Sequence, residues 1–292
     1  ASDWSSDVCS SDLSIEELRD LFSLGLYSNV IDEASSISKG DEEAEFLLLR
    51  SRIVRDPLDF VINTTKAGTT PVQKGIHFLA ESLKITVKEK LESYLEGADM
   101  DLAKNSQYYS ICVAIVNLRA SRNIEALEVL NGNEYPEAVG LRIQALLAIN
   151  RPDLAEKELG NINNSPILLV LCKAFVALFL GIEETKNALF ELLDLSDRFE
   201  SSIILSNLIA VCHFAIGEWA NGRSQVLIAD GLSDNNDTTK INTALSLFHS
   251  SDDFEKLKDQ TEMIKSMNNV YSLKIQDMLK DFDDAAEVIK NQ

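Results

Sequence analysis

The sequence predicts an all-α protein, built as a solenoid of about eight helix-turn-helix pairs followed by a C-terminal helix. Apolar residues recur at helical spacing along almost the whole chain, and no segment alternates convincingly as a strand would. The loops are short and marked by glycine, asparagine, serine or proline, so neighbouring helices must run antiparallel. These loops also recur every 29 to 36 residues. That interval is one helix pair, whose apolar face is covered only when the next pair stacks on it.

The turns between paired helices divide the sequence. We expect the first helix of each pair to end at or near Gly25, Arg55, Ile85, Ser121, Asn150, Gly181, Gly217 and Ser250. Two helices show the apolar spacing most clearly. Their apolar residues are Leu205, Leu208, Ile209, Cys212 and Ile216 in one, and Ile275, Met278, Leu279, Phe282 and Ala286 in the other. Both sets place one apolar stripe along a helix.

The first thirteen residues stand apart from this pattern. Residues 1–13 read ASDWSSDVCSSDL, which has no apolar period and resembles a translated adapter sequence. We interpret them as a non-native segment and place the solenoid domain at residues 14–292, as one continuous array. The longest break within it, residues 64–71, is predicted to be a surface loop.

Composition narrows the classes of ligand. With 45% hydrophobic and 25% charged residues the chain is of globular type. Its formal net charge of −20 repels nucleic-acid phosphates and anionic headgroups, so neither is expected as a direct ligand. A protein partner with a basic patch suits this charge better, and a merely well-solvated surface is the interpretation that the charge alone favours. Residues 166–182 are mostly apolar, but the stretch begins with proline and contains Lys173. It is short for a membrane span and is predicted to be a solenoid helix.

No motif for catalysis, metal binding or cofactor binding emerges. Cys112, Cys172 and Cys212 lie in apolar runs, where free thiols pack as small hydrophobes, and a reducing compartment follows. His77 and His249 are isolated, and His213 has only the adjacent Cys212, which points in another direction on a helix. Phosphate-binding and nucleophile-turn glycine motifs are absent from the sequence. We therefore expect no enzyme, no cofactor and no metal; a helical hydrolase or transferase without a recognisable motif is the remaining catalytic alternative.

One stretch resembles a tetratricopeptide repeat. Residues 205–232 carry Ala210 and Gly222 where two helices approach closely, Gly217 at the end of the first helix, and Trp219 just after the turn. An aromatic residue invites interpretation as an interface anchor, but the repeat pattern favours a core position for Trp219.

Four stretches, one of them within residues 205–232, resemble one known family. They are LRDLFSLGLYSNVIDEA at 18–34, RPDLAEKEL at 151–159, IAVCHFAIGEW at 209–219 and SLKIQDMLKDFDDAAEVI at 272–289. In this order they resemble the epsilon subunit of coatomer, from about residue 15 to the end. The resemblance implies a cytoplasmic structural subunit of the COPI vesicle coat, peripheral on Golgi membranes and COPI-coated vesicles. It also implies that the chain clasps the C-terminal region of the alpha subunit and meets other coatomer subunits through it, with no nucleic-acid partner and only indirect membrane contact. Its role would be retrograde Golgi-to-ER and intra-Golgi transport.

Stacked repeats line a concave channel with their first helices. In that register the predicted partner-binding residues are Tyr108, Ile111, Ile115, Asn207, Val211 and Phe214. Packing against a neighbouring helix is the alternative role for each. The alternative function is a generic tetratricopeptide adaptor that binds a short peptide tail through lysine and arginine. The second group of three positions offers no such base, while Arg119 in the first unit leaves that possibility open.

Overall fold

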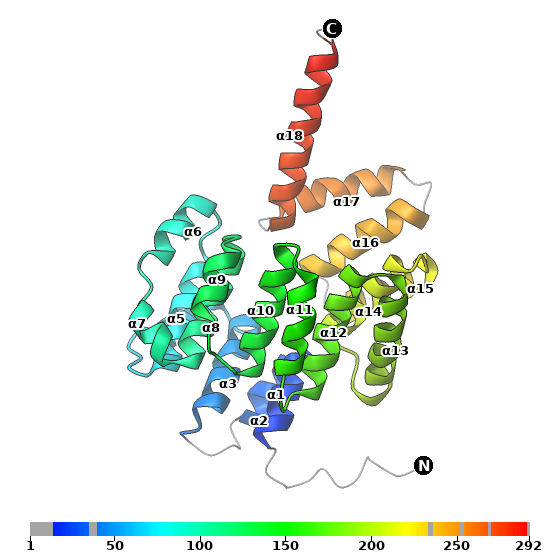
Figure 1. The fold of residues 1–292 in the computed structure, drawn as a ribbon. Helices are drawn as coiled ribbons and strands as arrows, with labels where there is room; N and C mark the ends of the chain where they lie inside the picture. The colour runs from blue at the N-terminus through cyan, green and yellow to red at the C-terminus, as the bar shows by residue number, and fades with distance from the viewer. Residues whose placement is uncertain (1–13, 35–39, 233–235, 251–253, 268–269, 291–292) are drawn as a thin grey trace, which may run out of the picture. The chain divides into compact units, whose positions relative to one another are not determined.

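The computed structural model describes residues 14–34, 40–232, 236–250, 254–267 and 270–290. Within these ranges the chain forms 18 α-helices, one short 3₁₀ helix and no strand. Figure 1 shows the helical ribbon from the N-terminal helices in blue to α18 in red. The predicted all-α class is confirmed. Residues 1–13, which we interpret as non-native, lie outside the described ranges.

The helices follow the predicted pairing. The first helices of the pairs are α1 (Ile15–Ser23), α3 (Glu42–Arg55), α5 (Pro71–Leu83), α8 (Gln107–Arg119), α10 (Pro136–Ala148), α12 (Pro166–Leu180), α14 (Ile203–Ala215) and α16 (Asp237–Ser250). The second helices are α2 (Tyr27–Ala34), α4 (Leu58–Thr65), α6 (Lys88–Leu95), α9 (Asn123–Val129), α11 (Pro152–Glu158), α13 (Ile182–Arg198), α15 (Trp219–Leu232) and α17 (Phe254–Ser266). Three elements complete the chain: α7 (Met100–Asn105), the 3₁₀ helix η1 (Leu159–Asn161) and α18 (Val270–Lys290). Each of the eight first helices ends within two residues of its predicted position.

The ends of the first helices use residues that tolerate a left-handed backbone. Gly25 and Gly217 have φ of 76° and 85°, and Ser121 and Asn150 have φ of 61° and 58°. A residue in this conformation just beyond a helix lets the following N–H groups reach back to unpaired carbonyls. After α14, for example, the Gly217 and Glu218 N–H groups donate to the carbonyls of Phe214 and His213 over 3.1 and 2.8 Å. The turn is therefore fixed by the local sequence.

Contacts divide the chain into two compact units, Ala1–Val176 and Ala177–Gln292, with the boundary inside α12. Each unit is described below by itself. The single array from 14 to 292 therefore stays a prediction.

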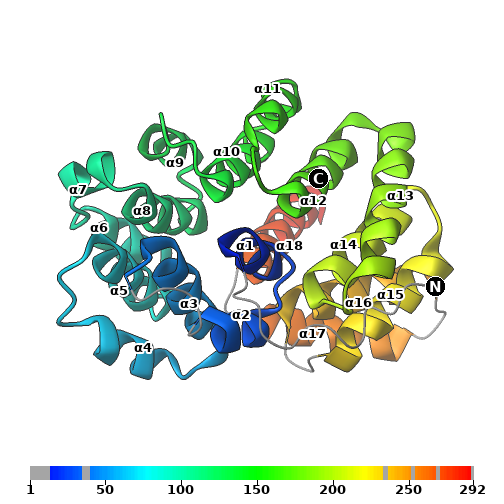
Figure 2. The same cartoon turned by 90° about the horizontal axis from the view of Figure 1, so that it is seen from below.

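In the first unit, consecutive first helices pack on one another: α1 on α3, α3 on α5, α5 on α8 and α8 on α10. The approach of α5 to α8 is close, because a Cβ atom on Gly75 would lie 3.2 Å from the Cys112 sulfur. Figure 2 shows α1 beside α2 and α3. From α1, the Arg19 guanidinium donates a 2.8 Å hydrogen bond to the Asn164 carbonyl, 145 residues along the chain. The first unit therefore joins its beginning to its end.

Two details of the first unit differ from the sequence interpretation. The loop predicted at 64–71 is shorter, because Thr65 remains in α4 and Pro71 begins α5. The Thr65 hydroxyl donates to the Val61 carbonyl one helical turn earlier, and proline is tolerated at the first helical position. In the following pair, α6 and the six-residue α7 replace one continuous second helix.

In the second unit, α14 packs against α13, α15 and α16, while α17 packs against α16 and α18. Gly222 of α15 faces α14 so closely that a Cβ atom would lie 3.0 Å from the Ala210 carbonyl oxygen, which confirms the small positions predicted there. Trp219 is only partly buried, although the repeat pattern predicted a core position. Its ring stacks between Phe214 and His249, with centroids 5.2 and 3.6 Å away. It therefore lies at the edge of the α14–α15 contact.

The remaining sequence expectations concern the apolar stretch and the cysteines. None of the described helices has both the length and the apolar content needed to cross a membrane, and residues 166–180 form the solenoid helix α12. Cys112, Cys172 and Cys212 are free and buried, as predicted.

Candidate partner-binding groove

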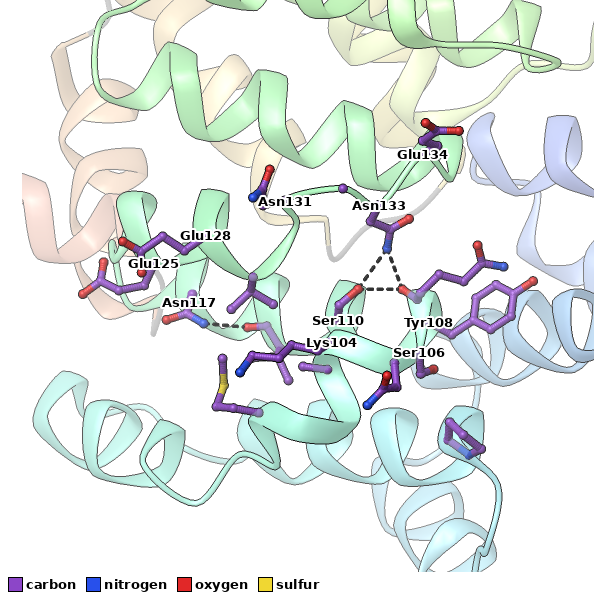
Figure 3. A pocket seen from close by; sticks show the side chains of 18 of the residues that line it. Lys104, Ser106, Tyr108, Ser110, Asn117, Glu125, Glu128, Asn131, Asn133 and Glu134 are labelled. Carbon is purple, nitrogen blue, oxygen red and sulfur yellow. Dashed lines mark hydrogen bonds between the residues drawn. The ribbon is translucent and has the colours of Figure 1, made fainter.

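A groove of about 1150 Å³ runs along α8 in the first unit, with α7 and α9 as its walls (Figure 3). The wall formed by α7 is short, because this helix has only six residues. The floor is one face of α8. That face carries Gln107, Ser110, Val113 and Asn117, which recur at helical spacing and line the groove floor.

Hydrogen bonds hold one end of the groove in place. The Asn133 amide nitrogen donates to the Gln107 carbonyl and the Ser110 hydroxyl oxygen, each over 2.9 Å. Its amide oxygen accepts from the Tyr135 N–H over 3.0 Å, and its carbonyl accepts from Arg142 over 2.6 Å. The loop formed by residues 131–134 is thereby tied to both α8 and α10, so this wall is preformed.

The walls carry more acid than base. The charged lining residues are Glu42, Glu125, Glu128, Glu134, Lys104 and Arg122. Arg122 donates to Glu125 over 2.9 Å, so this base is already partly neutralised. Backbone hydrogen bonding and then the Arg122 contact hold the Glu125 pKa below its ordinary value. Figure 3 shows Glu125 and Glu128 toward one end of the groove and Glu134 toward the other. A segment with basic side chains fits this distribution.

Asn117 gives the floor its hydrogen-bonding character. It is only 4% exposed. Its amide nitrogen donates to the Val113 carbonyl over 3.0 Å. The buried amide therefore keeps this part of the floor polar.

The three predicted partner-binding residues of the first unit all lie on α8 and have different surroundings. Tyr108 lines the groove, but its ring packs on Phe46 and Tyr135 with centroids 4.8 and 5.5 Å apart. Ile111 is fully buried, whereas Ile115 is partly buried against the core of the unit. The partner role of these residues stays a prediction. Ile111 has no exposed surface, Tyr108 has little, and Ile115 is partly exposed.

The three predicted residues of the second unit lie on α14. Asn207 is buried, donates to the Thr239 hydroxyl over 2.8 Å and accepts from the Asn242 amide over 2.7 Å. This network joins α14 to α16. Phe214 is buried against Gly222 and Trp219, and Val211 is partly exposed. Their partner role also stays a prediction, while the contacts of Asn207 and Phe214 serve the packing of the unit itself.

Sequence reasoning missed the groove walls and a polar cluster behind them. In this cluster, Glu43 accepts hydrogen bonds from Arg19 and Tyr135, each over 2.8 Å. Arg50 and Glu137 form a second ion pair over 2.9 Å. The Asn-Gly-Asn run at 131–133 is a local turn signal that marks the loop, but not the α8 face that it covers.

Metal chemistry finds no support in the described ranges, where no three histidine, cysteine or carboxylate side chains gather as a metal site would require. Repeated helix pairs with a polar groove along one of them define a helical-repeat scaffold.

Comparison with known proteins identifies the kind of scaffold. The family model described as "Coatomer epsilon subunit" matches residues 14–289. The chain therefore belongs to the coatomer epsilon subunit family, a family of structural coat subunits and not of enzymes. This confirms the family resemblance and the coatomer, COPI and vesicle-transport assignment drawn from the sequence.

Three curated relatives are named as epsilon subunits of coatomer. "Coatomer subunit epsilon" of Dictyostelium discoideum is 26% identical over 238 residues, which span 75% of this chain and 78% of that protein. "Coatomer subunit epsilon-2" of Arabidopsis thaliana is 23% identical over 223 residues, and "Coatomer subunit epsilon-1" is 26% identical over 224 residues. Each of these two alignments spans 73% of this chain and 75% of the relative.

Proposed function

We propose that this chain clasps the C-terminal region of the coatomer alpha subunit and supports retrograde Golgi-to-ER and intra-Golgi transport, peripheral on Golgi membranes and COPI-coated vesicles. The observation that carries the proposal is the family match over residues 14–289. A subunit of a coat must associate with other subunits, and stacked helix pairs are suited to that task because they offer extended concave surface.

The α8 groove supplies a place for a segment of the alpha subunit. Its floor includes the buried polar side chains of Ser110 and Asn117, and its walls carry four glutamates against two bases. A segment with lysine or arginine would find complementary charge, which favours fast and specific association.

A tail-binding adaptor is the second candidate function. The charge of the groove and the contacts of Arg119 argue against it. A carboxylate tail would meet four glutamates along this groove. Arg119 donates to the Ser82 hydroxyl over 3.0 Å and to the Ile85 carbonyl over 3.5 Å, so this base is already engaged within the first unit. No observation favours the adaptor.

The direct test is co-expression with the C-terminal region of the alpha subunit from the same species. We expect one stable 1:1 complex in size-exclusion chromatography with light scattering. Separate elution at micromolar concentrations, with both chains folded by circular dichroism, would overturn the proposal.

A charge reversal tests the groove itself. Glu128→Lys changes an exposed wall residue of α9, and we expect it to weaken binding of the alpha region several-fold, chiefly through slower association. Glu156→Lys makes the same change at an exposed position of α11 outside the groove and serves as the control. Equal affinities of the two variants would place the partner elsewhere.

A further inference from the structure

The C-terminal helix α18 exposes the apolar stripe that its sequence predicts. Met278 and Phe282 are 71% and 70% exposed, and Leu279 between them is 42% exposed. Ala286 is partly exposed, and the side chain of Ile275, the remaining member, lies outside the described ones. The residues at i, i+1 and i+4 share one side of a helix. In α14 the residues at the same spacing are buried, so the exposure in α18 does not follow from spacing alone.

Within the described ranges, Met278, Leu279 and Phe282 stay exposed. Helix α18, the red helix of Figure 1, has 21 residues and packs against α17. An amphipathic helix in a soluble protein normally turns its apolar stripe to a core. A methionine, a leucine and a phenylalanine together are the anchors that a helix offers to an apolar groove of another protein.

Acidic residues border the stripe. Between positions 278 and 287 the exposed acids are Asp281, Asp283, Asp284 and Glu287, against one exposed base, Lys280. The segment therefore carries four negative charges and one positive charge, a net −3. Any surface that covers the stripe must accommodate this negative rim.

The charge of each candidate partner decides which one can cover the stripe on α18. A second copy would bring the same acids and the same chain charge of −20, so like charges would face each other. Residues 1–13 carry three acids and no base, and they are equally unsuited. Helices that lie on membranes carry lysine and arginine on their polar face, and α18 has mostly acids there. A protein groove rimmed by lysine or arginine is the remaining complement.

We propose that α18 inserts Met278, Leu279 and Phe282 into an apolar groove with a basic rim on the coat subunit that this chain holds. The inference rests on the proposed function and adds the contact residues and the chemistry of the partner surface. It places a contact in the second unit, in addition to the α8 groove of the first.

The test compares two double variants of the full chain against the C-terminal region of the alpha subunit. M278S/F282S replaces two of the three proposed contact residues, the two most exposed ones, and leaves Leu279 in place. F190S/L227S removes two equally exposed apolar side chains of α13 and α15, which are 72% and 63% exposed. Because all four side chains are exposed, both variants should keep the helical content and melting temperature of the unmodified chain. We expect M278S/F282S to bind the alpha region at least tenfold more weakly by calorimetry, and F190S/L227S to bind as the unmodified chain does.

Each other outcome is decisive. If the unmodified chain binds and M278S/F282S binds equally well, the inference is overturned while the proposed function stands. If the unmodified chain does not bind, the proposed function fails and the inference fails with it. If the isolated chain forms a dimer and M278S/F282S is a monomer, the stripe binds a second copy of the chain. If the unmodified chain co-sediments with phosphatidylcholine–phosphatidylserine vesicles and M278S/F282S does not, the stripe binds membranes. Either result overturns the proposal.

Discussion

The Tyr135 phenol donates a 2.8 Å hydrogen bond to the Glu43 carboxylate, which lies 92 residues earlier in the chain. The same carboxylate oxygen accepts from Arg19 over 2.8 Å. Burial raises the pKa of Tyr135, so the phenol stays protonated and remains a donor. One oxygen atom therefore joins α1, α3 and the start of α10.

We expect Glu43→Gln to lower the free energy of unfolding by about 1–3 kcal/mol, because it leaves the partly buried Arg19 without its counter-charge. Urea denaturation followed by circular dichroism measures the loss. Glu42→Gln, the same change at the exposed neighbouring residue, should cost less than about 0.5 kcal/mol. Equal midpoints for the two variants would contradict a structural role for the cluster.

Gly222→Ala should destabilise the second unit by about 1–3 kcal/mol through overpacking. The added Cβ atom would lie 2.3 Å from the Phe214 ring and 3.0 Å from the Ala210 carbonyl oxygen, so α14 and α15 must separate. Gly231→Ala in the same helix meets nothing within 4 Å and should stabilise α15 by about 0.5–1 kcal/mol. Thermal unfolding of the two variants should shift in opposite directions, and a shared direction would refute the packing argument.

The Asn207–Asn242 hydrogen bond should appear as an energetic coupling between α14 and α16. A double-mutant cycle of Asn207→Ala and Asn242→Ala should give a coupling of about 1 kcal/mol or more, since both amides are buried and meet over 2.7 Å. A cycle of Asn207→Ala with Asn221→Ala, an exposed residue of α15, should give a coupling near zero. Additive effects in both cycles would show that the buried amides stabilise their helices independently.

Asp20 should make the protein less stable as the pH rises. Burial raises the pKa of its carboxyl from 3.8 to about 6, against the opposing effect of Arg19. Between these values the folded state binds more protons than the unfolded state, so the free energy of unfolding falls with increasing pH. Because the group is only half-buried, Asp20→Asn should stabilise the protein by about 1 kcal/mol at pH 7.

The Asp20→Asn advantage should largely disappear below about pH 3, where the carboxyl is mostly neutral in both states. Chemical denaturation at several pH values measures the difference. Glu156→Gln, a change of an exposed acid on α11, is the control. An advantage of Asp20→Asn that stays constant with pH would contradict the burial of this carboxyl.

The three buried thiols should resist modification in the folded protein. Burial raises the pKa of Cys112, Cys172 and Cys212 to about 12 each, and the thiol form does not attack disulfide reagents. In a Cys9→Ser background we expect no release of thionitrobenzoate from Ellman's reagent at pH 8, and three equivalents after unfolding in guanidinium. Rapid labelling of the native protein would indicate that these helices open readily.

The helix boundaries could be predicted because their signals are local. Gly25, Ser121, Asn150 and Gly217 each mark a turn by tolerating positive φ, whatever lies elsewhere in the chain. The break between α6 and α7 has a weaker signal. Asp99 caps α7 by accepting from the Leu102 N–H over 2.9 Å, yet an aspartate two residues after a glycine also fits an ordinary loop.

The site could be predicted only in part, because it depends on pairs that are distant in the sequence. Apolar periodicity shows that a helix has a buried side, but first helices such as α8 and α14 pack on both sides. Tyr108, Ile111, Asn207 and Phe214 therefore lie mostly inside the protein. The groove wall at Asn133 depends on contacts with residues 23 and 26 positions earlier, and no local sequence pattern predicts these contacts.

The hydrogen bond from Arg19 to the Asn164 carbonyl spans 145 residues. During translation the ribosome must add all of these residues before the bond can form, which takes roughly 7 to 30 s at ordinary elongation rates. Over that interval α1 lacks this bond, although the helices on which it packs, α2 and α3, are already made. The acceptor is made with the connection that precedes α12. Synthesis order thus places this bond among the last contacts of the first unit to form, long after α1 has found its nearer partners.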